Sequence, residues 1–285
     1  MGQYDTLRYQ SNNNMPPRRS KEFICGACAS IVNTIVTYPI SKVIFRQQIY
    51  GLTTSASLQQ IQGEGAKFVY RGIMFPLMQR GICMSIMFGT YNTYTIWLID
   101  NWPWQTTTGV RQLAAFFSGA SEATFTPFER LQSLMQHKGF NHSVSNSFTG
   151  FNLVRQHGVR ELYKGYYLIV LRNGFSNILF FSIKDLLKTH IPPPHDYTTL
   201  YNFAVGAGLG AFLSTLFYPV NVVKNRLQSS IGYEYSSLVQ LFTKTYKEKG
   251  GTIQSLYKGV HLNYGRAILS WGIVNSVYEY LVTKL

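Results

Sequence analysis

One stretch of the sequence occurs three times in altered form: TYPISKVIFRQQ at residues 37–48, FTPFERLQSLMQ at residues 125–136, and FYPVNVVKNRLQ at residues 217–228. The copies begin 88 and 92 residues apart. Each has Pro at its third position (Pro39, Pro127, Pro219) and Gln at its twelfth (Gln48, Gln136, Gln228). A period of this kind indicates that the chain is built from repeats of one structural unit.

Two further features recur in step with the prolines. Later in each copy stands an aromatic–basic–Gly triplet: Tyr70-Arg71-Gly72, Tyr163-Lys164-Gly165 and Tyr257-Lys258-Gly259. Small residues precede each Pro at equal spacing: Gly26/Ser30, Ala114/Ser118 and Gly206/Gly210. Each repeat is therefore predicted to contain a helix kinked at Pro, a connection, and a second helix. The predicted units are a disordered tail over residues 1–22 and three repeats over residues 23–99, 111–190 and 200–283.

The apolar segments have the length of membrane spans. Six segments carry at most one charge each, at residues 23–41, 73–99, 112–128, 165–183, 200–223 and 259–278. About 20 apolar residues are needed to cross the hydrocarbon core. We therefore predict an all-α membrane protein with six transmembrane helices in three two-helix repeats. A soluble helical protein is the alternative, but core helices rarely run so long with so little charge.

The charge of the chain is concentrated between these segments. The net charge is +14, although only 13% of residues are charged, about half the usual share of roughly 25%. The connections 46–71, 130–164 and 224–258 carry +2, +4 and +4, whereas 100–111 and 184–199 are neutral. Basic connections tend to stay on one side of a membrane, so both termini are expected on the opposite side. A nucleic-acid binder would instead gather its basic residues on one surface.

The basic connections have room for short surface helices. Apolar residues recur at three- and four-residue spacing in two of them: Phe148, Phe151 and Val154, and Leu238, Leu241 and Phe242. This spacing predicts a helix in each of these connections.

The repeats resemble those of the mitochondrial carrier family. The family pattern is Pro-x-acid-x-x-base-x-base, followed by acid-Gly-x4-aromatic-base-Gly. Repeat one keeps Glu64-Gly65 and the triplet but lacks the acid and the first base, repeat two keeps Glu129, and repeat three keeps Lys224 and Arg226. The resemblance implies six helices around a central cavity, alternating access without catalysis, and a monomer. It also implies the inner mitochondrial membrane, with the basic loops and bound cardiolipin on the matrix side and both termini toward the intermembrane space.

Three arginines interrupt the even-numbered spans at one depth. Arg80, Arg172 and Arg266 lie ten, nine and nine residues after the triplet Tyr of their repeats. A charge within a span is costly and suggests a functional site. Because guanidinium groups bind phosphate in a bidentate manner, we predict a site for a nucleotide diphosphate. The alternative, that the side chains reach for the lipid headgroups, fits poorly with residues this far inside a span. Polar neighbours predicted to bond the base or carboxamide are Gln79, Asn173, Asn177 and Asn263.

Glu122 is the one acidic residue well inside a predicted span. It precedes Glu129 by two helical turns, so both lie on one face, which the resemblance places toward the cavity. The equivalent positions in the other repeats hold Thr34 and Ser214. We predict that Glu122 bonds a ribose or faces the nicotinamide cation of NAD+; neutralisation of one of the arginines is the alternative. Segments such as Arg172-Asn173-Gly174 resemble family members that carry NAD+. The expected substrate is NAD+, with coenzyme A, an adenine nucleotide, or a scaffold without transport as alternatives.

The residues after each Pro are predicted to form the matrix gate. Among the family's six acid and base positions there, only Glu129 and Lys224 supply an interhelical ion pair. Gln48, Gln136 and Gln228 are expected to brace the closed gate by hydrogen bonds.

Other motifs carry no chemistry that we expect to matter. Cys25-x-x-Cys28 lies inside an apolar span without the further ligands that a zinc site needs. Gly206-x-Gly208-x-Gly210 lacks the spacing of a dinucleotide fingerprint, and we interpret it as helix packing. We expect no metal, no cofactor other than NAD+ as transported substrate, no catalytic residues and no nucleic-acid partner.

Overall fold

The computed structural model describes residues 19–102, 107–140, 147–191, 198–232 and 237–284, and every regular element in these ranges is a helix. The long helices are α2 (Arg19–Tyr50), α5 (Met74–Asn101), α6 (Thr107–Glu122), α7 (Thr126–Gln136), α10 (Tyr166–His190), α11 (Thr198–Leu216), α12 (Tyr218–Gln228) and α15 (Val260–Lys284). The predicted tail lies mostly outside the described residues. Residues 19–22, which we expected to belong to the disordered tail, instead form the first turn of α2.

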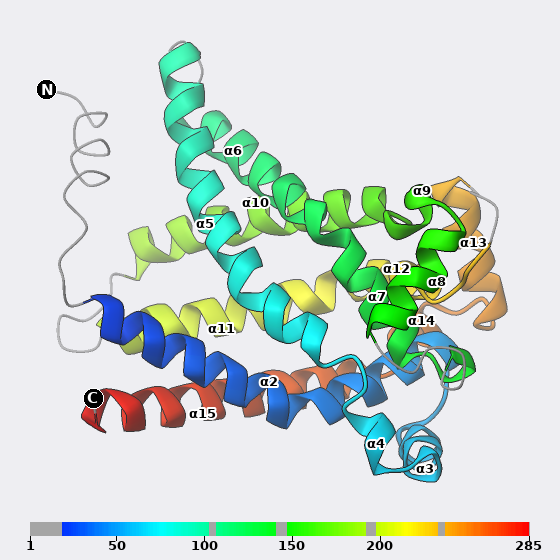
Figure 1. The fold of residues 1–285 in the computed structure, drawn as a ribbon. Coiled ribbons are helices and arrows are strands. Elements are labelled where there is room, and N and C mark those ends of the chain that lie inside the picture. The colour runs from blue at the N-terminus through cyan, green and yellow to red at the C-terminus, as the bar shows by residue number, and fades with distance from the viewer. Residues whose placement is uncertain (1–18, 103–106, 141–146, 192–197, 233–236, 285) are drawn as a thin grey trace, which may run out of the picture.

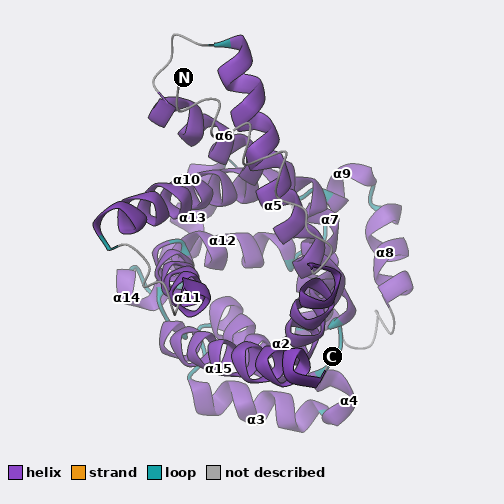
Figure 2. Cartoon of the chain, turned by 90° about the vertical axis from the view of Figure 1, so that its left-hand side faces the viewer, coloured by secondary structure: helices purple, strands orange, loops and turns teal. Residues whose placement is uncertain are grey.

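The long helices form a ring (Figure 2). Helix α15 packs against α2, and α6 packs between α5 and α10. The short connecting helices lie at one end, which we call the loop-helix end, and the C-terminus lies at the other (Figure 1). All six predicted spans are thus helical, and the predicted all-α class with three helix pairs is confirmed.

The first long helical segment of each repeat contains one of the three prolines, and in repeats two and three this segment is broken near the proline. A 3-10 turn, Ala123–Phe125, separates α6 from α7. Helices α11 and α12 meet at Phe217 with a bend of 64°. Pro127 and Pro219 lie at the starts of α7 and α12, where the missing N–H costs nothing. The expected kink does not break repeat one, where α2 continues as one helix through Pro39.

Hydropathy alone identifies fewer spans than the repeats do. Within the part of the chain that the structure describes, one helix is long and apolar enough to cross a membrane, Cys25–Tyr50, and the bent pair Ala204–Leu216 and Tyr218–Gln228 passes together. The other long helices carry polar residues along the ring interior, which lowers their mean hydropathy.

Short helices fill the connections at the loop-helix end. They are α3 (Thr54–Glu64), α4 (Ala66–Val69), α8 (Ser147–Gln156), α9 (Val159–Leu162), α13 (Leu238–Glu248) and α14 (Ile253–Leu256). Helices α8 and α13 confirm the prediction from apolar spacing. Ser237 caps α13 through a capping box with Gln240, in which each side chain bonds the other's backbone.

In repeats one and three the aromatic–basic–Gly triplet is bonded to the Pro helix of its own repeat. Tyr38 donates to the carbonyl of Arg71 at 2.6 Å, and Tyr218 donates to that of Lys258 at 2.7 Å. The Tyr38 ring also stacks on Tyr70, at an interplanar angle of 15°. Gly259 has φ +92°, and a Cβ there would lie 2.8 Å from the Tyr218 hydroxyl, so only Gly fits. The recurrence of the triplet therefore has a packing cause.

Helices α6 and α10 approach each other most closely at two glycines. A Cβ on Gly119 would lie 2.5 Å from the carbonyl carbon of Asn173, and one on Gly174 would lie 2.5 Å from the Phe116 ring. By contrast, a Cβ on Gly206, Gly208 or Gly210 would meet nothing within 4 Å. The interpretation of those three glycines as helix packing is wrong, because α11 has open space beside them.

This difference makes Gly119→Ala a sharp packing test. The added methyl must push α10 away from α6, and overpacking of this kind costs about 1–3 kcal/mol. We expect the apparent unfolding temperature of the purified protein to fall by about 5 °C. Gly208→Ala is the matched control and should leave that temperature unchanged or raise it slightly, since Ala favours helix. Equal effects of the two substitutions would contradict the close approach.

Candidate substrate-binding site

A cavity of about 460 Å³ lies inside the ring of helices. It is lined by most of the residues that the sequence singles out: Gln79, Arg80, Glu122, Arg172, Asn173, Asn263 and Arg266, together with Gln48, Glu129, Gln136 and Lys224. Asn177 lines a second cavity of about 590 Å³, which shares Glu122 and Arg172 with the first. Gln228 lines neither cavity and is fully buried beside the gate. The candidate site is therefore one polar space with an extension toward α11.

The three arginines differ in their partners. Arg80 donates to the Thr34 hydroxyl at 3.2 Å, and Arg266 donates to Asn263 Oδ1 at 2.9 Å. Among the described residues neither of these two arginines forms an ion pair, so both keep positive charge for a ligand. Arg172 instead donates to Asn221 Oδ1 at 2.8 Å and lies 4.0 Å from Glu129.

The first long helix of each repeat (α2, α6 and α11) contributes one polar residue at an equivalent position, and each of these residues bonds the second long helix of its repeat (α5, α10 and α15). Thr34 accepts from Arg80, and Ser214 accepts from Asn263 at 2.8 Å. Glu122 accepts from Asn177 at 2.9 Å and from Asn173 at 3.4 Å. All three repeats thus have a polar side chain at this position, but the side chains differ: two are hydroxyls, and repeat two has a carboxylate. Such an arrangement suits an asymmetric ligand.

The Glu122 carboxylate is held by two amides rather than by an arginine. Among the residues that the structure describes it forms no ion pair, and it borders both cavities. The carboxyl group thus remains available to a ligand inside the cavity.

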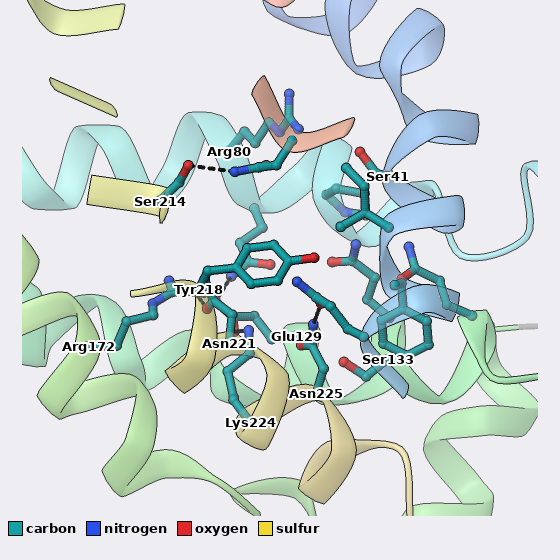
Figure 3. A pocket seen from close by; sticks show the side chains of 18 of the residues that line it. Ser41, Arg80, Glu129, Ser133, Arg172, Ser214, Tyr218, Asn221, Lys224 and Asn225 are labelled. Atoms are coloured by element: carbon teal, nitrogen blue, oxygen red, sulfur yellow. Dashed lines mark hydrogen bonds and ion pairs between the residues drawn. The ribbon is translucent and has the colours of Figure 1, made fainter. Parts of the chain in front are cut away.

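At the loop-helix end of the cavity the Glu129 carboxylate forms ion pairs with Lys224 and, at the longer distance given above, with Arg172. Lys224 Nζ lies 2.7 Å from Glu129 Oε2, as the sequence predicts, and both side chains are at most 15% exposed. Gln79 Nε2 donates to the other Glu129 oxygen at 3.2 Å. Glu129, Lys224 and Arg172, from α7, α12 and α10, are among the cavity-lining residues labelled in Figure 3. Gln79, expected to bond the substrate, is therefore attached to the closing ion pair.

Hydrogen bonds between repeats supplement this ion pair. Gln48 accepts from Asn225 at 2.5 Å, and Gln228 accepts from Ser133 at 3.3 Å. Sequence reasoning missed Asn225 and Ser133. The signal was present, because both stand six residues after the Pro of their repeat. The equivalent residue in repeat one is Phe45, which offers Gln136 no hydrogen-bond partner.

A ring of helix pairs around a polar, arginine-lined cavity with one closed end defines a membrane transporter rather than an enzyme. The model of the family described as mitochondrial carrier protein matches residues 17–102, 105–194 and 195–285. The chain belongs to the mitochondrial carrier family. It is accordingly a multi-pass protein of the inner mitochondrial membrane.

Curated relatives cover nearly the whole chain. The human mitochondrial nicotinamide adenine dinucleotide transporter SLC25A51 is 41% identical over 92% of this chain and 89% of its own length. The mouse protein of the same name is 38% identical over 95% of this chain and 94% of its own length. A more distant relative, human solute carrier family 25 member 53, is 28% identical over 98% of this chain and 93% of its own length.

Proposed function

We propose that this protein carries NAD+ into the mitochondrial matrix through the central cavity by alternating access. The observation that carries the proposal is the combination of three arginines with a single carboxylate in one cavity. The arginines suit the diphosphate, and Glu122 suits the positive nicotinamide ring. The identity to two NAD transporters supports this choice. Carriage of coenzyme A or an adenine nucleotide is the second candidate, because the arginines suit those phosphates equally well.

The proposed arrangement of the molecule follows the sequence. Three repeats over residues 23–99, 111–190 and 200–283 form a monomer with cardiolipin bound on the matrix side. The loop-helix end, with its basic connections, faces the matrix, and both termini face the intermembrane space.

The proposed coupling of binding to opening uses Arg172 and Gln79. Both line the cavity, and both lie at Glu129 in the closed state. A diphosphate competes with Glu129 for these donors, since each new bond to the ligand weakens one to the carboxylate. The Glu129–Lys224 pair then loses two supporting contacts, and the closed end opens.

The decisive measurement of substrate is uptake by liposomes that contain the purified protein. Labelled NAD+ should enter faster than NADH, ATP or coenzyme A at equal concentration. Preference for coenzyme A or ATP would instead favour the second candidate, and no uptake of any of them would favour a scaffold.

Glu122→Gln tests the assignment of the nicotinamide ring. Replacing the carboxylate removes its attraction for the cation, which we expect to lower NAD+ uptake by about 10-fold while NADH uptake changes little. Ser214→Ala, at the equivalent position in repeat three, changes no charge and should affect NAD+ and NADH alike. An unchanged ratio of NAD+ to NADH uptake in Glu122→Gln would refute the assignment.

A further inference from the structure

A second cluster of cations lies outside the central cavity, in a pocket of about 410 Å³ at the loop-helix end. Arg226 from α12, Lys249 after α13 and Lys258 after α14 line it, together with Gly51, Glu248 and Ser255. Its walls adjoin the gate, because Arg226 directly follows Asn225, the partner of Gln48.

The pocket holds more positive charge than its carboxylate neutralises. Arg226 pairs with Glu248. Lys258 donates to the carbonyl of Gly51 at 2.9 Å, and Lys249 reaches the carbonyl of Gln47 at 3.5 Å. Neither lysine forms an ion pair with any residue that the structure describes. Burial, followed by repulsion from Arg226 and Lys258, lowers the pKa of Lys249 to about 8. The two lysines thus lack a counter-ion.

The same positions in the other repeats differ in charge. In repeat one Arg46 pairs with Glu64 at 2.9 Å, as Arg226 pairs with Glu248. From Glu64 to Tyr70 is six residues, whereas from Glu248 to Tyr257 is nine, and this longer segment begins with Lys249. In repeat two the triplet Lys164 pairs with Glu161 at 2.9 Å. The residue that corresponds to Glu161 in repeat three is Ser255. Compared with repeat two, repeat three therefore lacks a carboxylate beside its triplet lysine, and its longer segment adds Lys249 to the same pocket.

We propose that this pocket is a second anion site, which binds a phosphate group just outside the gate. The two lysine ammonium groups supply donors suited to phosphate oxygens. The phosphate comes either from a nucleotide at the mouth of the transport path or from a lipid headgroup. The site does not depend on which substrate the central cavity carries.

The experiment measures binding of labelled pyrophosphate to the full-length protein in a neutral detergent. Wild-type protein should bind pyrophosphate both at the central site and in the pocket. Lys249→Gln and, separately, Lys258→Gln should each weaken the pocket site by about 10-fold and leave the central site intact. Lys247→Gln is the matched control, because it removes the same charge from neighbouring α13 but does not line the pocket. Thermal unfolding of each variant verifies that it is folded.

Two arms identify the source of the phosphate. The titration is repeated in nanodiscs of phosphatidylcholine with and without cardiolipin. Displacement of pyrophosphate from the pocket by cardiolipin supports the site and assigns it to a lipid headgroup; undisturbed binding supports it and assigns it to a soluble phosphate. The proposal is overturned if both Lys249→Gln and Lys258→Gln bind pyrophosphate as Lys247→Gln does. Because the readout is pyrophosphate binding, a failure to transport NAD+ leaves this result unaffected.

Discussion

NAD+ uptake should fall by about 100-fold when Arg266 is replaced by Gln. Arg266 lines the central cavity, and among the described residues it bonds Asn263 but no carboxylate. Its charge is therefore available to a diphosphate. A bidentate contact consists of two charge-assisted hydrogen bonds, and the loss of ~3 kcal/mol corresponds to about 100-fold. Initial rates of labelled NAD+ uptake into liposomes, at equal protein content, give the measurement.

Two companion substitutions separate the possible causes of such a loss. Arg266→Lys keeps the charge but not the planar fork, so uptake should fall by about 10-fold only. Arg155→Gln removes an exposed arginine of α8 that lines neither cavity, and should leave uptake unchanged. If Arg266→Gln transported NAD+ as well as Arg155→Gln does, the diphosphate would not bind where we propose.

Replacing Glu129 by Gln should lower the apparent unfolding temperature of the closed state by about 10 °C. The substitution leaves the Lys224 ammonium, 9% exposed, without its carboxylate. Breaking a buried ion pair on one side costs about 3–5 kcal/mol, and each kcal/mol shifts the midpoint by a few degrees in a chain of this size. Thermal unfolding of the detergent-purified protein, without substrate, is the measurement.

The double variant Glu129→Gln/Lys224→Gln tests whether the pair itself is responsible. It leaves no uncompensated charge, so it should be more stable than Glu129→Gln alone. Asp185→Asn is the control at an exposed pair, where Arg111 lies 3.3 Å from a half-exposed carboxylate. Exposed pairs contribute little, so its midpoint should move by less than about 2 °C. A double variant less stable than Glu129→Gln would argue against this account.

The repeats made most of the fold predictable. Pro39, Pro127 and Pro219 fix the register of three equivalent units, and a residue in one unit then has known counterparts in the others. The equal depth of Arg80, Arg172 and Arg266 followed from that register, and the structure brings all three to one cavity. Hydropathy alone would have found α2 and little else.

What the sequence did not predict depends on individual side-chain partners. Gln79 was assigned to the substrate, yet it bonds Glu129, because both residues lie where α5 meets α7. The spacing of Gly206, Gly208 and Gly210 suggested a tight interface, whereas the tight interface is at Gly119 and Gly174. Small residues permit a close approach without requiring it, and only the neighbouring helix decides.

Two kinds of contact hold the repeats together at the loop-helix end of the cavity: ion pairs and hydrogen bonds between uncharged side chains. Beside the charged residues Glu129, Lys224 and Arg172, uncharged amides and hydroxyls also join the repeats there, as between Gln48 and Asn225. These groups carry no net charge and gain or lose no proton near neutrality. The bonds between these uncharged groups are therefore insensitive to the acidity and salt content of the compartment they face, and a response to either would come from the charged groups beside them.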